Sequence, residues 1–312
     1  VMGTTYHIRY VSEGSENKQN LQKSIQDMLE SVSMSMSVHY DDSEINGFNN
    51  LKDTFKRYPV SDQFLHVLIE AERLYRITEG AWDGSVNPLV NLWGFGNASG
   101  EIRVPDRMDV ERLLKTTGFD QIEISESGFI RKKNPGVSID LNSIAKGYGV
   151  DRVAELLKYK NIGNFIVEVG GEIVTSGKKP GGTIWRVGIN RPDNQASAND
   201  VYKVVTLNNK AMATSGDYRN FHEIEGVLYS HIINPRTGMP IQNGVVSASV
   251  ISDTCTFADG LATALMVMGE KKGIDLVNRL ENTECLIVVR KPDNSLEDFY
   301  SKGFLIMTEG LN

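Results

Sequence analysis

Two oxygen-bearing side chains stand four residues apart near the C-terminal end of the chain, Asp259 and Thr263. Residues 258–268 are apolar enough to form a helix, which would place both side chains on one face, one turn apart. A carboxylate and a hydroxyl leave room for waters and phosphate oxygens, and such hard ligands suit Mg²⁺. The pair therefore predicts a magnesium site for phosphoryl-group chemistry.

His231 is the histidine best placed to act as a proton acceptor beside such a site. It precedes a turn at Asn234-Pro235, where a strand is expected to end. A lone histidine at a strand end can equally have a purely structural role. His66, inside a predicted helix, is expected to be structural, whereas His222 could be either.

A possible phosphate seat precedes a helix in the middle of the chain. A buried strand is expected over residues 137–140, and a loop then leads into a helix over residues 146–157. Lys146 would lie in the first turn of that helix, and a helix N-terminus with a lysine can bind phosphate. The alternative is a capped helix whose lysine is solvated.

Two glycine-containing segments allow more than one interpretation. Residues 80–96 contain Trp82, Trp93 and four glycines, so this stretch is either a wall that binds a ring or a satellite core. Gly170-Gly171 follows a predicted strand but precedes another strand. A dinucleotide fingerprint requires a helix there, so a tight hairpin turn is expected instead.

The composition is that of a soluble globular protein. The 312 residues are 40% hydrophobic and 23% charged, and the net charge of −7 argues against nucleic acid as a partner. No apolar run approaches the roughly 20 residues that span a bilayer. Cys255 and Cys285 are too few for a disulfide framework and are expected to be buried.

The elements that must position these residues follow from hydrophobic periodicity and turn signals. Helices are predicted over residues 21–32, 61–74, 105–114, 146–157, 258–268 and 271–280. Strands are predicted over residues 4–10, 121–124, 128–131, 137–140, 164–169, 172–177, 185–189, 201–207, 212–215, 245–251, 285–290 and 304–307. Residues 178–182 are expected to form a hairpin turn. We expect one interlocked α+β domain over residues 1–312, with largely antiparallel sheets flanked by helices.

Taken together, the motifs resemble the ApbE family of flavin transferases, the FAD:protein FMN transferases. The segments that carry the resemblance are Met2-Gly3-Thr4, Gly80-Ala81-Trp82-Asp83, residues 140–148, Val169-Gly170-Gly171, residues 214–220, residues 230–238 and residues 259–264. The resemblance covers almost the whole chain and implies an ApbE-like fold related to the T-fold.

The resemblance implies a Mg²⁺-dependent transferase. Such an enzyme splits FAD, attaches the FMN half through its phosphate to a threonine or serine of a target protein, and releases AMP. The alternatives are a Mg²⁺-dependent FAD pyrophosphatase and a non-catalytic FAD-binding protein. The expected acceptors are flavin-carrying subunits of sodium-pumping and related membrane electron-transfer complexes. The expected location is the periplasm or the outer face of the bacterial cytoplasmic membrane, with a lipid anchor that lies outside this sequence.

Site residues follow from the same resemblance. Asp259, Thr263 and the backbone carbonyl of Ser143 match the family's metal ligands, and His231 matches its catalytic histidine. The positions that match FAD contacts are Met2, Ala81, Trp82, Asp83, Asp140, Lys146 and Ile233. The mechanism that we expect has His231 deprotonate the acceptor hydroxyl while Mg²⁺ bridges the pyrophosphate.

This chain departs from the family pattern at two positions. His39 stands where most relatives have a tyrosine that stacks on the flavin, and imidazole offers a smaller stacking face. Members without that ring tend toward FAD hydrolysis, so His39 is expected to loosen the hold on flavin. Asn234 stands where many relatives have aspartate, and it keeps a turn-forming side chain.

Overall fold

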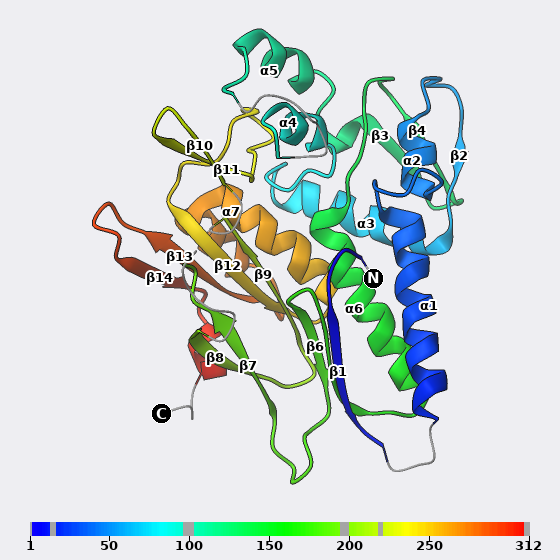
Figure 1. Ribbon diagram of the computed structural model, residues 1–312, viewed down its shortest axis with the longest axis vertical. Coiled ribbons are helices and arrows are strands. Elements are labelled where there is room, and N and C mark those ends of the chain that lie inside the picture. The colour runs from blue at the N-terminus through cyan, green and yellow to red at the C-terminus, as the bar shows by residue number, and fades with distance from the viewer. Residues whose placement is uncertain (1, 13–16, 96–102, 194–199, 218–220, 309–312) are drawn as a thin grey trace.

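A seven-stranded antiparallel sheet forms the centre of the computed structural model, which describes residues 2–12, 17–95, 103–193, 200–217 and 221–308 (Figure 1). The strand order is β1-β5-β6-β9-β12-β13-β14. The bounds are β1 (Tyr6–Val11), β5 (Asn164–Val169), β6 (Glu172–Ser176), β9 (Ala211–Gly216), β12 (Val245–Ser252), β13 (Glu284–Arg290) and β14 (Leu296–Tyr300). The predicted α+β class with antiparallel sheets is confirmed.

Two helices, α6 (Asn142–Tyr159) and α7 (Cys255–Val277), pack against each other and against this sheet (Figure 1). α7 contacts β9 and β12, and α6 contacts β5 and β6. Most of α7 is buried, as expected for a helix whose apolar residues extend all round its axis. These two helices carry the predicted metal ligands, so their packing decides the geometry of the site.

The outer helices α1 (Lys18–Met36) and α3 (Asp62–Ile77) cover α6 and α7. Each has one buried apolar stripe, as its helical spacing predicts. Ser61 caps α3 because its side chain accepts a hydrogen bond from the Phe64 amide, in agreement with the predicted cap. The sequence thus predicted both outer helices correctly.

Smaller elements surround this framework. They are the sheet β2-β4-β3, the hairpins β7–β8 and β10–β11, and three short helices. Their bounds are β2 (Tyr58–Pro59), β3 (Ile122–Ser125), β4 (Phe129–Lys132), β7 (Trp185–Asn190), β8 (Val201–Leu207), β10 (Phe221–Ile224), β11 (Val227–Ser230), α2 (Glu44–Asn49), α4 (Asn87–Leu92) and α5 (Arg107–Leu114). Hydrophobic periodicity and turn signals did not predict α2, α4, β2, β10, β11 or β14.

Two predicted strands are wrong. Residues 137–140 form no strand, although Val137 and Ile139 are buried alternately. The side chain of Asn49 replaces a strand partner, since its amide bonds both the carbonyl and the N–H of Ile139 at 2.8 Å. Residues 304–307 lie in a 3₁₀ helix, Phe304–Thr308, in which Phe304 is buried while Leu305 and Ile306 are exposed, so no alternating face exists.

Other boundaries differ in ways that affect the site. α6 begins at Asn142 because Asp140 Oδ1 accepts a hydrogen bond from the Asn142 amide at 2.8 Å, so Lys146 lies in the second turn and not the first. The two predicted C-terminal helices form α7, which is interrupted at Gly269 by a φ of 79°.

Residues 178–182 connect β6 to β7, which lies in another sheet, so the predicted hairpin there is wrong. Gly170-Gly171 does form the predicted hairpin turn, between β5 and β6.

Candidate active site

One cavity of about 470 Å³ brings together most of the residues that the sequence predicted. Its lining includes Ala81, Trp82, Asp83, Asp140, Ser143, Lys146, His231, Ile233, Asp259 and Thr263. Met2 and His39 line a second cavity of about 470 Å³. Asn142 and Lys146 line both cavities, so the two adjoin at the start of α6. The structure thus places all the predicted site residues in two neighbouring cavities.

The close packing of α6 against α7 fixes the position of the Asp259 carboxylate. Its Oδ2 accepts a hydrogen bond from the Gly147 amide at 2.9 Å. A Cβ atom on Gly147 would lie 2.3 Å from the carbonyl oxygen of Cys255, so only glycine lets the helices come this close. In a regular helix the Gly147 N–H would donate a hydrogen bond to the Ser143 carbonyl. Asp259 competes with that carbonyl for the same N–H.

A second tie between the two helices comes from Asp151 on α6. Its carboxylate accepts hydrogen bonds from the amides of Cys255 and Thr256, at 2.9 and 2.8 Å, and from the Thr256 hydroxyl. These are the first amides of α7, which have no partner within the helix. Asp151 thus caps α7 from the neighbouring helix and holds the turn that carries Asp259 in register with α6.

Replacing Asp151 with alanine should therefore lower the free energy of unfolding by about 2 kcal/mol, because a charged cap and its hydrogen bonds are lost. Urea titration followed by circular dichroism would measure this change. The matched control is Glu155→Ala, one turn further along α6 and exposed. Equal losses in the two variants would show that the cap does not stabilise α7.

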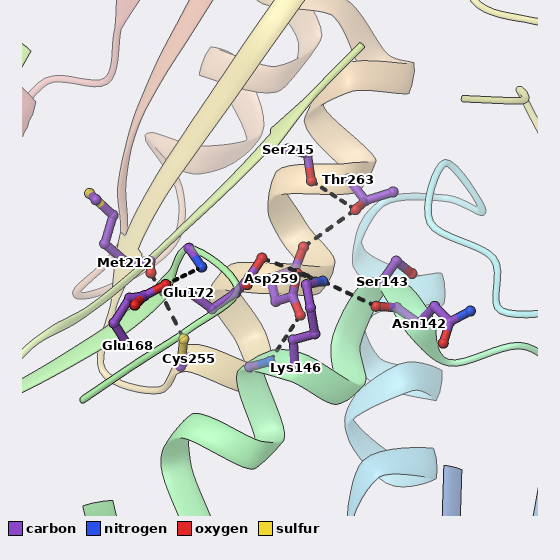
Figure 2. A network of polar contacts seen from close by, with 12 residues as sticks. Asn142, Ser143, Lys146, Glu168, Glu172, Met212, Ser215, Cys255, Asp259 and Thr263 are labelled. Carbon is purple, nitrogen blue, oxygen red and sulfur yellow. Dashed lines mark hydrogen bonds and ion pairs between the residues drawn. The ribbon is translucent and has the colours of Figure 1, made fainter. Parts of the chain in front are cut away.

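The ammonium group of Lys146 lies between two buried carboxylates (Figure 2). Its Nζ is 3.4 Å from Glu172 Oε1 and 3.6 Å from Asp259 Oδ1, and it donates to the Asn142 carbonyl at 3.3 Å. Burial, and then the negative charge of Asp259, raise the pKa of Glu172 to about 8. The two carboxylates in turn hold the pKa of Lys146 above its usual value, against the effect of burial. Lys146 thus belongs to a charge cluster, and the solvated-lysine alternative is wrong.

Glu172 was not among the predicted site residues. Its side chain is buried, and Oε2 has no hydrogen-bond partner among the described residues. A buried carboxylate oxygen without a donor is costly unless a cation or ligand joins it. The available sequence signal was a glutamate directly after the Gly170-Gly171 turn, at the end of the sheet that faces the two helices.

The donor atoms around Asp259 fit a magnesium ion. Thr263 Oγ1 lies 3.0 Å from Ser215 Oγ and 3.5 Å from the Asp259 carbonyl oxygen, on the turn of α7 that carries Asp259 (Figure 2). No cluster of three histidine, cysteine or acidic side chains suited to a metal occurs within the part of the chain that the structure describes. One carboxylate, one hydroxyl and the Ser143 carbonyl are the oxygen-only, incomplete set that Mg²⁺ completes with waters and phosphates. Their assignment as metal ligands stays a prediction.

His231 directly follows β11 and lines the first cavity. Its ring lies edge-on to Phe95, with 6.3 Å between centroids, and Phe95 stacks on His222 at 4.2 Å. His222 also lies 3.2 Å from the Gly94 carbonyl and does not line the cavity, so it has a packing role. Of these two histidines, only His231 is placed for chemistry in the cavity.

The tryptophans of residues 80–95 belong mainly to the core. Trp93 packs with Leu89, Val110 and Ile233 in a satellite cluster, so the satellite-core alternative is correct for it. Trp82 is also buried, and its Nε1 donates to Ser143 Oγ at 3.1 Å, which places one edge at the cavity. Gly96, and residues 218–220 of another motif, lie outside the described residues.

Asp83, the neighbour of Trp82, is a buried carboxylate with few donors. Its Oδ1 accepts hydrogen bonds from the amide and hydroxyl of Ser85, at 2.8 and 2.6 Å. Burial raises the pKa of Asp83 to about 6 despite these hydrogen bonds. The folded protein therefore binds a proton here between about pH 4 and pH 6 that the unfolded chain has already lost.

Stability should fall as pH rises through this window, because ionisation of Asp83 is easier in the unfolded chain. Asp83→Asn keeps an acceptor for Ser85 and cannot ionise. We expect this variant to match the wild type near pH 3.5 and to be about 2 kcal/mol more stable at pH 7. Urea unfolding at both pH values would measure the difference. A difference that stays constant across the window would contradict the prediction.

The family model described as the ApbE family matches residues 2–287. The chain belongs to the ApbE family. The FAD:protein FMN transferase of Vibrio cholerae is 41% identical over 304 residues, covering 97% of this chain and 89% of that protein. The FAD:protein FMN transferase of Haemophilus influenzae is 38% identical over 313 residues, covering 99% and 90%. The resemblance inferred from the motifs is thereby confirmed.

Solved ApbE structures also match this fold. The flavin transferase ApbE from Vibrio cholerae aligns with a TM-score of 0.88 at 40% identity, covering 98% of this chain and 96% of that chain. The apo flavinyl transferase ApbE of Pseudomonas stutzeri gives a TM-score of 0.88 at 33% identity, covering 99% and 94%. These two relatives are flavin transferases by name, and this ApbE-family chain shares their fold over nearly its whole length.

Proposed function

We propose that this ApbE-family protein transfers the FMN half of FAD to a serine or threonine hydroxyl of a target protein and releases AMP. The observation that carries the proposal is the shared cavity, in which His231 lies with Asp259, Thr263 and Lys146. It combines a proton acceptor, oxygen ligands for a hard cation and a fixed positive charge. The relatives named FAD:protein FMN transferase support it.

In the proposed reaction, the acceptor hydroxyl attacks the phosphorus of the FMN half. His231 takes the hydroxyl proton, the new O–P bond forms, and the P–O bond to AMP breaks, so AMP leaves with both electrons of that bond. Lys146 offers positive charge to the phosphate oxygens. Mg²⁺, held by Asp259, Thr263 and the Ser143 carbonyl, would supply further neutralisation of the pyrophosphate. Trp82 and Asp83 lie at the same cavity wall, where they can position the nucleotide.

A second candidate function is Mg²⁺-dependent hydrolysis of FAD to FMN and AMP. The observation that favours it is His39, which lines the second cavity together with Met2 and Tyr40. Imidazole stacks on a flavin over a smaller area than phenol, so water can replace the acceptor hydroxyl more easily. The same residues would then act on water.

Incubation with FAD, Mg²⁺ and an acceptor protein separates these two functions. The acceptor that we propose is a flavin-carrying subunit of a membrane electron-transfer complex from the same cells. Transfer is expected to add one FMN phosphoester to a single serine or threonine, detected by mass spectrometry of the acceptor. Free FMN and AMP without labelled acceptor would instead establish hydrolysis. FAD that stays intact over hours would indicate a protein that binds FAD without turning it over.

For the location, we propose the outer face of the bacterial cytoplasmic membrane, through a lipid anchor of the full-length protein. The family resemblance supports this proposal. Among the described residues, no helix is both long and apolar enough to cross a bilayer. Fractionation of cells that produce the full-length protein would test the location, and recovery in the cytosol would contradict it.

A further inference from the structure

Ser215 lies on the face of strand β9 that is turned toward α7. Side chains alternate along a strand, so Ser215 shares this face with Ala213, and it pairs across the sheet with Ala248. Ala213 and Ala248 both belong to the core cluster that contains the buried residues of α7. Ser215 is the next residue on this face after Ala213, and it lines the first cavity. The sheet therefore presents one hydroxyl group to the helix that carries Asp259 and Thr263.

The hydroxyl of Thr263 has two acceptor oxygens within reach (Figure 2). Its Oγ1 lies 3.0 Å from Ser215 Oγ and 3.5 Å from the carbonyl oxygen of Asp259, one turn earlier in α7. A threonine in a helix commonly donates its hydrogen to such a carbonyl of its own helix. The Ser215 oxygen is closer, so the strand offers Thr263 a better partner than the helix does.

The direction of the hydrogen bond between the two hydroxyls decides whether Thr263 can bind a cation well. A threonine hydroxyl has one hydrogen and two lone pairs. If Ser215 donates, its hydrogen occupies one of the Thr263 lone pairs. If Thr263 donates, both of its lone pairs stay free. A cation on the Thr263 oxygen favours the second direction, because its charge polarises the O–H bond and makes the hydroxyl a better donor.

From this geometry we infer that Ser215 is a positioning residue for the proposed Mg²⁺ site: it accepts the Thr263 hydrogen and leaves the lone pairs of that oxygen to the ion. The inference rests on the proposed function, which takes Thr263 as a metal ligand. Without the Ser215 hydroxyl, the Thr263 hydrogen would turn toward the Asp259 carbonyl or into the cavity. The lone pairs would turn with it, away from the direction that suits the ion.

The test is Ser215→Ala, with isothermal titration of Mg²⁺ into the folded protein. We expect the Mg²⁺ affinity to fall about tenfold or more, the usual effect of removing a hydrogen-bond partner of a metal ligand. Ser215→Thr keeps a hydroxyl and suits a strand, so it should retain most of the affinity. Circular dichroism would confirm that each variant is folded.

The matched control is Ser249→Ala, on the neighbouring strand β12. Ser249 follows Ala248, so it lies on the opposite face of the sheet from Ser215, and its Oγ is 2.8 Å from Thr214 Oγ1. Ser249 is buried and lines neither cavity near α6. The variant therefore loses an equivalent hydrogen bond between hydroxyls without touching Thr263, and it should bind Mg²⁺ like the wild type.

Three results would overturn the role of Ser215. They are unchanged Mg²⁺ affinity in Ser215→Ala, an equal loss in Ser249→Ala or in Ser215→Thr, and a wild type that does not bind Mg²⁺. The last of these would also remove Thr263 from the ligands. Mg²⁺ affinity that depends on the Ser215 hydroxyl, in a protein that neither transfers FMN nor hydrolyses FAD, would keep the inference and overturn the proposed function.

Discussion

Flavin transfer should fall about 10²- to 10⁴-fold when His231 is replaced by glutamine, which is the range that a general base contributes. Glutamine keeps a polar side chain of similar length and cannot take the proton of the acceptor hydroxyl. FAD should still bind, because the cavity walls that include Trp82, Asp83 and Ile233 are unchanged. Covalent fluorescence of the acceptor after electrophoresis measures transfer, and quenching of flavin fluorescence measures binding.

The control for this variant is His222→Gln. His222, on strand β10, contacts the same Phe95 ring as His231 does, yet it does not line the cavity. It should retain most of the transfer rate. Retention of more than a few per cent of the activity in the His231 variant would show that another group accepts the proton. Loss of FAD binding there would instead assign His231 to substrate binding.

Asp259→Asn should lower the rates of both transfer and FAD hydrolysis by about 10²- to 10⁴-fold at millimolar Mg²⁺. The carboxylate is the one charged side chain among the proposed ligands, and a metal contributes several kcal/mol to such reactions. Asparagine preserves the shape and can still accept the Gly147 amide, so α6 and α7 should stay in register. Isothermal titration should show a matching loss of Mg²⁺ affinity.

Asp275→Asn provides the matched control on the same helix. Asp275 lies beyond the interruption at Gly269, is exposed and does not line the cavity. It should keep both the transfer rate and the affinity for Mg²⁺. If Asp259→Asn bound the metal as tightly as the wild type, the ligand assignment would be wrong, even if the rate fell.

Much of the architecture could be predicted because single segments carry its signal. The apolar stripes of α1 and α3 and the alternation of β5 are local patterns that tertiary structure preserves. The strand predicted over residues 137–140 shows where this fails. Buried and less buried residues do alternate there, but the backbone of Ile139 is hydrogen-bonded by the side chain of Asn49 and not by a neighbouring strand. A partner of this kind leaves no periodic pattern in the sequence.

The sequence predicted residues that the structure brings together in neighbouring cavities, but not the electrostatics around them. Asp259, Thr263 and His231 have informative types and spacing, and the cavity brings them together. The burial of Glu172 depends on how the β5–β6 turn meets α6 and α7, which no local pattern reveals. The close pairing of its partner Lys146 with two carboxylates is also a property of the packed helices.

The position of the Lys146 ammonium group also affects the order in which the chain folds and binds the proposed Mg²⁺. The ammonium group of Lys146 lies between Glu172 and Asp259 and offsets part of the repulsion between the two carboxylates, and the raised pKa of Glu172, about 8, lets a proton offset more of it near neutral pH. We therefore expect the chain to fold without the proposed Mg²⁺, because its buried carboxylates already have a cationic partner. The proposed Mg²⁺ would compete with the Lys146 ammonium group for the Asp259 carboxylate. Folding and the binding of metal and nucleotide would then be separate steps. A chain that folds where metal and nucleotide are scarce would be native and able to bind both later.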